Sequence, residues 1–323
     1  MANDSEGSAP SRGGAGGTLV GGAAARLITI LIVNLALAMT AVIYAQLRGG
    51  KLPSLNAETL SLGLLPISAA MGLVLACRRI DFSLPIVLVL ALDLQGNRGF
   101  FSGDTFLRLV VVCGVCGAVG LVSATVTWYG RVSSALWTGI LAFGLWLVIG
   151  VLKIEGAGPG TWPWIWAVPI SVGLLAAGAA VLGLTGLVVL PSSPPIIRSG
   201  SGGFAGLVGA WILAGAAVAL ASQSNVAQVT PQALQAAYPQ MLAAGALGGA
   251  FILRGKWGAL TAVLLTCVGH LTSSFAWSTN LGNSTADILV PALAPLAAIP
   301  LYLIMDWLIR RHTGESSPTG LLA

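Results

Sequence analysis

Apolar runs alternate with short polar links along most of the chain. A helix needs about 20 apolar residues to cross the hydrocarbon core of a bilayer, and only helices or closed barrels satisfy their backbone there. The pattern therefore predicts an all-α polytopic membrane protein with about ten transmembrane helices. Their expected ranges are 26–47, 59–77, 83–94, 106–128, 133–151, 166–190, 203–222, 238–253, 257–277 and 288–308.

The segment 83–94 differs from the other apolar runs in being short. It follows a polar break at Arg78-Arg79-Ile80-Asp81. Its length leaves two alternatives open, a full span and a half-helix that re-enters the membrane.

Composition excludes a soluble globule. The sequence is 56% hydrophobic and 8% charged, with a mean hydropathy of +0.91, whereas soluble domains carry about 25% charged residues. The 43 glycines are typical of closely packed membrane helices. We expect a disordered cytoplasmic tail at 1–25, a transmembrane permease domain at 26–310 and a second cytoplasmic tail at 311–323.

Basic residues in short loops orient a membrane protein, because cytoplasmic loops are enriched in Lys and Arg. The chain has 15 such residues. With both termini inside, most of them become cytoplasmic, so we predict an N-in, C-in topology. Trp162, Trp164 and Trp166 then form part of an outer aromatic belt. The basic residues predicted inside are Arg12, Arg26, Arg78, Arg79, Arg131, Arg198, Arg254, Lys256, Arg310 and Arg311.

Few polar residues interrupt the apolar runs, and each needs a physical reason. Asp81 and Ser83 stand at the break; Asp81 either caps the next helix or lines a translocation path. Asn97 is a third candidate for that path. Asp306 precedes Arg310 by one turn and is expected to pair with it. His270, with no acid at helical spacing, is interpreted as a packed, hydrogen-bonded residue.

No pattern of a soluble enzyme accompanies these residues. The chain has no phosphate-binding loop of the G-x-x-x-x-G-K-[ST] type, so we expect no nucleotide hydrolysis by this chain itself. Cys113 and Cys116 form a C-x-x-C inside an apolar run, without a second ligand pair, and are interpreted as packing residues. We predict a non-enzymatic protein without metal or other cofactor, and one that does not bind nucleic acid.

Two stretches of the sequence show the same succession of apolar and basic segments. Residues 71–94 comprise an apolar helix, a cationic break and an apolar segment, and residues 247–270 repeat that order. Related halves of this kind are frequent in transporters, where a path opens between two bundles.

These features resemble the permease subunits of ribose-type ABC importers, a group that includes the branched-chain amino-acid permeases. The family's Gly-Gly-Ile-Asp-Leu-Ser-x-Gly stretch is similar to Arg78–Pro85, with Asp81 and Ser83 retained. VSATVTWYGRVSSALWTGILAFGL (122–145), SGGFAGLVGAWILAG (201–215) and LRGKWGALTAVLL (253–265) resemble later family passages. The resemblance spans most of 55–310 and implies two inverted-repeat halves.

One departure concerns the cytoplasmic loop between the sixth and seventh spans. In the family this loop carries a short coupling helix that docks into the ATPase. Here it reads PSSPPIIRSGSG (191–202), and proline both removes an amide donor and obstructs a helix. Pro191 and Arg198 mark the candidate coupling loop, in which we expect no docking helix.

The resemblance implies a permease subunit that moves a small, sugar-like polar solute across a bacterial inner membrane. Its implied partners are a cytoplasmic ATP-binding subunit, a second permease subunit in a homo- or heterodimer, an extracytoplasmic solute-binding protein and membrane lipid. The altered loop keeps an alternative open: a divergent homologue that does not couple to an ATPase and forms the passive or structural half of a heteromeric membrane complex.

Overall fold

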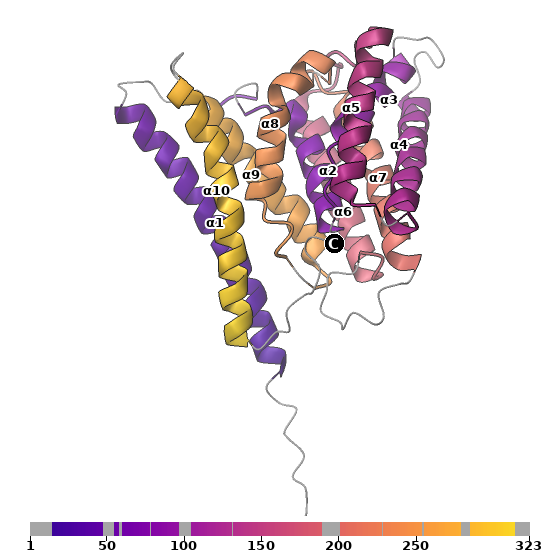
Figure 1. Cartoon of the computed structure of the whole chain (residues 1–323). Coiled ribbons are helices and arrows are strands. Elements are labelled where there is room, and N and C mark those ends of the chain that lie inside the picture. The colour runs from indigo at the N-terminus through magenta and orange to yellow at the C-terminus, as the bar shows by residue number, and fades with distance from the viewer. Residues whose placement is uncertain are drawn as a thin grey trace, which may run out of the picture.

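The chain folds into helices packed side by side in one bundle (Figure 1). This computed structural model describes residues 15–47, 55–57, 60–77, 79–96, 105–130, 132–188, 201–227, 229–253, 255–278 and 285–313. The α-helices are α1 (Ala15–Leu47), α2 (Leu65–Ala76), α3 (Leu84–Gly96), α4 (Thr105–Trp128), α5 (Ser134–Leu152), α6 (Trp164–Leu184), α7 (Ser201–Ala221), α8 (Pro231–Leu247), α9 (Gly258–Ser278) and α10 (Thr285–Thr313), with a short 3₁₀ helix, η2 (Leu62–Leu64), before α2.

Six helices are long and apolar enough to cross a membrane within the described part of the chain. These segments are Gly21–Leu47, Phe106–Trp128, Ser134–Leu152, Trp164–Leu184, Gly203–Ala221 and Gly258–Ser278. The helices η2–α2 and α3 are apolar but shorter. The protein is therefore all-α in its described residues and has the features of a multi-pass membrane protein.

The centre of the bundle is formed by α2, α7 and α9. Almost every residue of α2 is buried, and α2 and α8 both pack along α9, while α4 and α6 pack along α7. Apolar faces of α1, α4, α5 and α6 point outward. Lipid can solvate such faces, so they need no protein partner.

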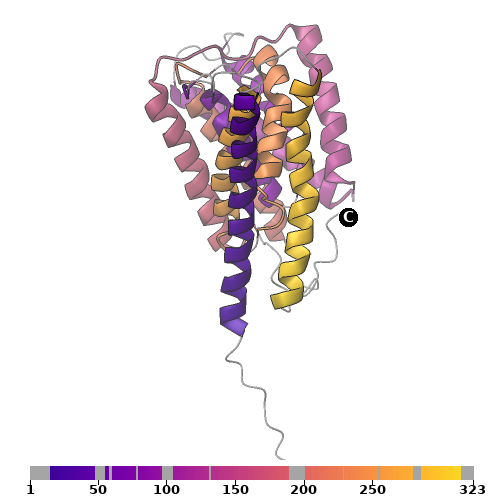
Figure 2. The same ribbon diagram turned by 90° about the vertical axis from the view of Figure 1, so that its left-hand side faces the viewer.

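The helices α1 and α10 lie together on one side of the bundle, against α8 and α9 (Figures 1 and 2). They run antiparallel, because Arg26 near the start of α1 pairs with Asp306 near the end of α10. We call this the inner end of the bundle, after the predicted orientation. The start of α1 and the end of α10 thus share one end of the bundle.

Several predicted boundaries differ from the structure. The expected tail reached residue 25, but α1 already begins at Ala15, and Arg26 is a buried residue within that helix rather than its edge. Helix α6 ends at Leu184 instead of 190, where Gly186 turns the chain with a φ of 74°. Helix α8 begins at Pro231 instead of 238, since Thr230 caps it by accepting a bond from the Ala233 amide.

The repeated segments 71–94 and 247–270 contain the turns that join α2 to α3 and α8 to α9. Both α2 and α8 run antiparallel to α9. Ser68 contacts His270 while the later Gly72 lies against the earlier Thr266, and Gln240 contacts Ser274 while Gly248 lies against Thr266. Both turns therefore lie toward the inner end. The two breaks thus meet the same end of the bundle, while the inverted-repeat halves implied by the resemblance stay a prediction.

Candidate functional site

The break between α2 and α3 is organised by Asp81. Its Oδ1 atom accepts hydrogen bonds from the Ser83 amide at 2.8 Å, the Ser83 hydroxyl at 2.7 Å and the Leu84 amide at 3.1 Å. Because the first amides of a helix have no intrahelical acceptor, this carboxylate stabilises the start of α3. The predicted capping role of Asp81 is confirmed, and the structure brings Asp81 and Ser83 together.

Side chains from three other helices, α5, α8 and α7, contact the non-helical segment between α2 and α3. The Thr138 hydroxyl of α5 accepts from the Phe82 amide at 3.2 Å, and the Tyr238 hydroxyl of α8 donates to the Phe82 carbonyl at 2.5 Å. The Trp211 indole of α7 approaches the Asp81 carboxylate, and its N–H donates no hydrogen bond to the described residues. Non-helical backbone in a membrane protein needs such protein partners.

The other predicted site residues lie outside the described part of the chain. They are Asn97, Pro191 and Arg198. The coupling loop and the Asn97 position therefore remain predictions.

A second polar cluster lies between α2, α8 and α9. We call it the polar seam; its members are Ser68, Gln240, His270, Ser273 and Ser274. All five are buried, although the surrounding helices are apolar. Polar side chains in membrane helices face the bundle interior or a water-filled path, because lipid does not hydrogen-bond to them.

His270 connects two segments of the chain through its two ring nitrogens. Nε2 lies 3.1 Å from the Ser61 carbonyl, and Nδ1 lies 2.8 Å from the Ser68 hydroxyl. A carbonyl only accepts, so Nε2 carries the proton and Nδ1 accepts from Ser68. Ser61 has a φ of 48°, in the left-handed region that few non-glycine residues adopt. The predicted hydrogen-bonded His270 is confirmed.

The seam continues along α8 and α9. The side-chain amide of Gln240 donates to the Ser274 hydroxyl. The Ser273 hydroxyl donates to the backbone carbonyl of Gln240 at 3.4 Å. Two residues earlier on α8, Tyr238 reaches the break. Pro239 stands between them inside the helix, where it removes one backbone donor. Residues 238–240 of α8 thus connect the polar seam with the break.

An open pocket of about 480 Å³ lies at the other end of the bundle, which we call the outer end. Leu60 and Leu62 line it and flank Ser61, so the η2 turn separates the pocket from His270. The described residues that line it are Leu55, Asn56, Ala57, Leu60, Leu62, Trp164 and Val226.

Two outer loops are joined beside this pocket. Ala157 and Val229 exchange backbone hydrogen bonds of 3.1 and 3.0 Å, and the Asn225 amide donates to the Trp162 carbonyl at 2.8 Å. Asp93, at the end of α3, accepts from the Glu155 and Gly156 amides at 3.0 Å each. The outer end is therefore a structured surface.

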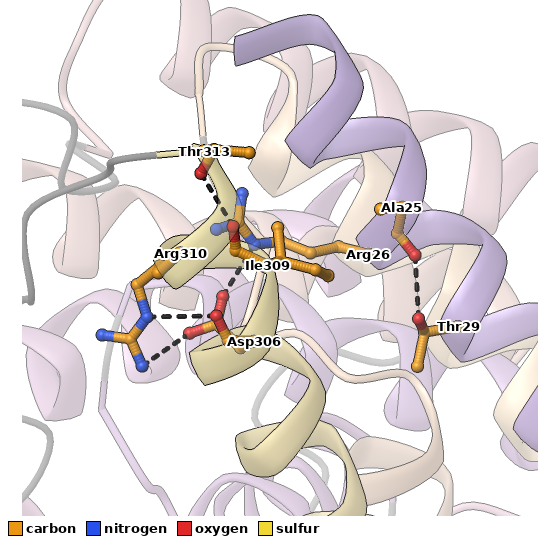
Figure 3. Close-up of polar contacts among 7 residues, drawn as sticks. All are labelled: Ala25, Arg26, Thr29, Asp306, Ile309, Arg310 and Thr313. Atoms are coloured by element: carbon orange, nitrogen blue, oxygen red, sulfur yellow. Dashed lines mark hydrogen bonds and ion pairs between the residues drawn. The ribbon is translucent and has the colours of Figure 1, made fainter. Parts of the chain in front are cut away.

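The inner end carries a buried ion-pair cluster (Figure 3). Asp306 accepts from Arg26 Nε at 2.7 Å through Oδ1, and its Oδ2 lies 3.1 Å from Arg310 Nη2. The predicted Asp306–Arg310 pair is confirmed. The interhelical pair was not predicted, because sequence spacing gives no distance between residues 26 and 306.

The described residues contain few groupings of the kind that form catalytic or metal-binding sites. Cys113 and Cys116 are free thiols; Cys113 contacts the Ile212 carbonyl, and Cys116 packs beside Gly215 of α7. No group of three or more potential metal ligands occurs in the described ranges. The arrangement supplies hydrogen-bonding groups inside an apolar bundle.

Comparison with known proteins identifies no relative. No protein family model, no curated protein and no solved structure matches this chain. Its function must be inferred from its own residues.

Proposed function

We propose that the protein is a permease subunit that provides a path for a small polar solute across the membrane. The observation that carries the proposal is the polar seam at the α2–α8–α9 contact, buried within an otherwise apolar bundle. Hydroxyl, amide and imidazole groups can exchange hydrogen bonds with a dehydrated solute, which lipid-facing side chains cannot.

The proposed path runs from the outer pocket to the break. It passes the η2 turn, follows His270, Ser68 and Gln240, and reaches Tyr238 and Asp81. In this state the η2 turn separates the pocket from the seam. Passage therefore requires η2 and the α2–α9 contact to move, as alternating access implies.

The finer proposal follows the sequence resemblance. In it, this chain is one permease subunit of an ABC importer in a bacterial inner membrane, has ten spans and pairs with a second permease. A solute-binding protein delivers a sugar-like solute to the outer end, and a separate cytoplasmic subunit hydrolyses ATP. The proline-rich loop 191–202 favours a second candidate, in which this chain is the passive half of a heterodimer and its partner contacts the ATPase.

Thiol labelling tests the path directly. In a variant whose four native cysteines are replaced, Ser274→Cys places a thiol in the seam, and Leu271→Cys places one on the exposed side of the same helix. A membrane-impermeant, water-soluble reagent should label Ser274→Cys in membranes, because the path must admit water in one of its states. Leu271→Cys should stay unlabelled in lipid. A seam thiol that resists labelling under every transport condition rules out this path.

Co-purification tests the finer proposal. Mild solubilisation of the native membrane should recover this chain with an ATP-binding subunit and a second permease. Recovery of the second permease and the ATPase only when the partner's coupling loop is intact supports the passive-half candidate. Repeated purification without any ATPase, together with unchanged uptake of sugars and amino acids after gene deletion, argues against ABC import.

A further inference from the structure

The last turns of α10 carry two different faces. Tyr302, Asp306 and Ile309 are buried against the bundle. Ile304, Trp307, Leu308 and Arg311 follow one another at spacings of three, one and three, so they share the opposite face. This second face is exposed: 56% of Ile304 and 52% of Trp307 are accessible.

Positive charge is concentrated at this end. Asp306 faces two guanidinium groups, those of Arg26 and Arg310 (Figure 3). A third guanidinium, that of Arg311, lies 5.5 Å from the centre of the Trp307 ring. Arg311 forms no ion pair within the described ranges, and the Arg310 side chain remains 14% exposed.

The residues along the exposed face change from apolar to basic in the order in which a bilayer leaflet changes from acyl chains to headgroups. Apolar Ile304 comes first, then Trp307, whose indole suits headgroup depth, and then Arg311 at the helix end. Arginine binds phosphate through its planar array of donors. A soluble anion would need the cations but not the continuous apolar face next to them.

We propose that the inner end of α10 binds an anionic phospholipid. Arg311 and Arg310 contact its phosphodiester, the Trp307 indole lies beside its glycerol region, and an acyl chain runs along Ile304 and Leu308. Arg26 and Asp306 hold α10 against α1, so the site has a rigid backing. The site requires membrane insertion but no transport activity, so it stands apart from the proposed permease function.

A lipid-binding experiment tests the site. The full-length protein is purified in a zwitterionic detergent, and bound phosphatidylglycerol is counted by native mass spectrometry at increasing lipid concentration. Phosphatidylcholine serves as the matched neutral lipid. Arg311→Gln should weaken phosphatidylglycerol binding about fivefold, the effect of removing one cation near an anionic lipid surface. Lys153→Gln removes one exposed charge at the outer end of α5 and should leave the binding unchanged.

A second measurement reports position. Phosphatidylglycerol brominated along its acyl chain should quench wild-type tryptophan emission more than that of Trp307→Phe, and Arg311→Gln should reduce this difference. Equal binding of phosphatidylglycerol and phosphatidylcholine, or wild-type binding by Arg311→Gln, overturns the proposal. Displacement of the lipid by millimolar inorganic phosphate would show a soluble-anion site and overturn it as well.

Discussion

The Ser68 hydroxyl of α2 lies 2.8 Å from Nδ1 of His270 on α9, although 202 residues separate them in the chain. Both side chains are fully buried. Since Nε2 of the same ring donates to the Ser61 carbonyl, one neutral imidazole connects the residue before η2 with α2 and α9. This contact joins α2 to α9, and it must break for a solute to pass along the proposed path.

A double-mutant cycle on this pair measures its strength. Ser68→Ala and His270→Leu should each destabilise the protein by about 1–3 kcal/mol, because each leaves a buried polar group without its partner. The double variant should lose less than the sum of the two, with a coupling of about 0.5–3 kcal/mol. Reversible unfolding in mixed micelles gives the four stabilities. Additive losses would show that the two residues do not interact in the folded protein.

The Arg26–Asp306 pair predicts asymmetric mutational costs. Asp306→Asn removes the carboxylate partner of a guanidinium that is 2% exposed, so a loss of about 3–5 kcal/mol is expected. The double variant Arg26→Met/Asp306→Leu should lose less, since only the partly exposed Arg310 is left without its carboxylate partner. Arg310→Gln, at a more exposed position, should cost at most about 1 kcal/mol. Thermal unfolding in detergent ranks the three, and a double variant less stable than Asp306→Asn would contradict the prediction.

The cap at the break predicts a graded series. Asp81→Ala removes the acceptor for two amides at the start of α3 and should cost about 1–2 kcal/mol. Asp81→Asn retains an oxygen acceptor and should recover most of that loss. Solute uptake in the same variants separates the two roles: a cap alone predicts that Asp81→Asn transports normally, whereas a path residue predicts impaired transport at near-normal stability.

The fold was largely predictable from the apolar pattern. Runs such as 106–128 and 133–151 lie within two residues of α4 and α5, because a bilayer span needs a long apolar helix and little else. The predicted helix 238–253 was less accurate, since α8 is less apolar and contains Pro239. Thr230-Pro231 is a capping signal that could have located its start.

The candidate site was only partly predictable. Asp81 and Ser83 are two residues apart, so their contact follows from local capping chemistry. The polar seam brings Ser68 together with His270, and such distant pairs depend on which helix faces pack. A single serine in an apolar run carries no signal of its partner. Arg26 and Asp306, at opposite ends of the sequence, were missed for the same reason.

Glycines at the α2–α8–α9 contact give a last test of the packing. A Cβ atom added at Gly72 would collide with the Thr266 side chain, and one added at Gly248 would lie 2.8 Å from the Thr266 Cα atom. Both Gly72→Ala and Gly248→Ala should therefore destabilise the protein by about 1–3 kcal/mol. Gly114→Ala on α4, where nothing lies within 4 Å, should be neutral or slightly stabilising, because alanine favours helix.

The two collisions differ in kind, which makes the test specific. At Gly72 the nearest atoms belong to the Thr266 side chain, whereas at Gly248 they include the Thr266 backbone. Thr266→Ala should thus restore part of the stability lost in Gly72→Ala and little of that lost in Gly248→Ala. Unfolding midpoints of the single and double variants decide it. Equal rescue of both would mean that α2 and α8 do not approach α9 as closely as described. The proposed contacts of the polar seam between these helices would then be wrong.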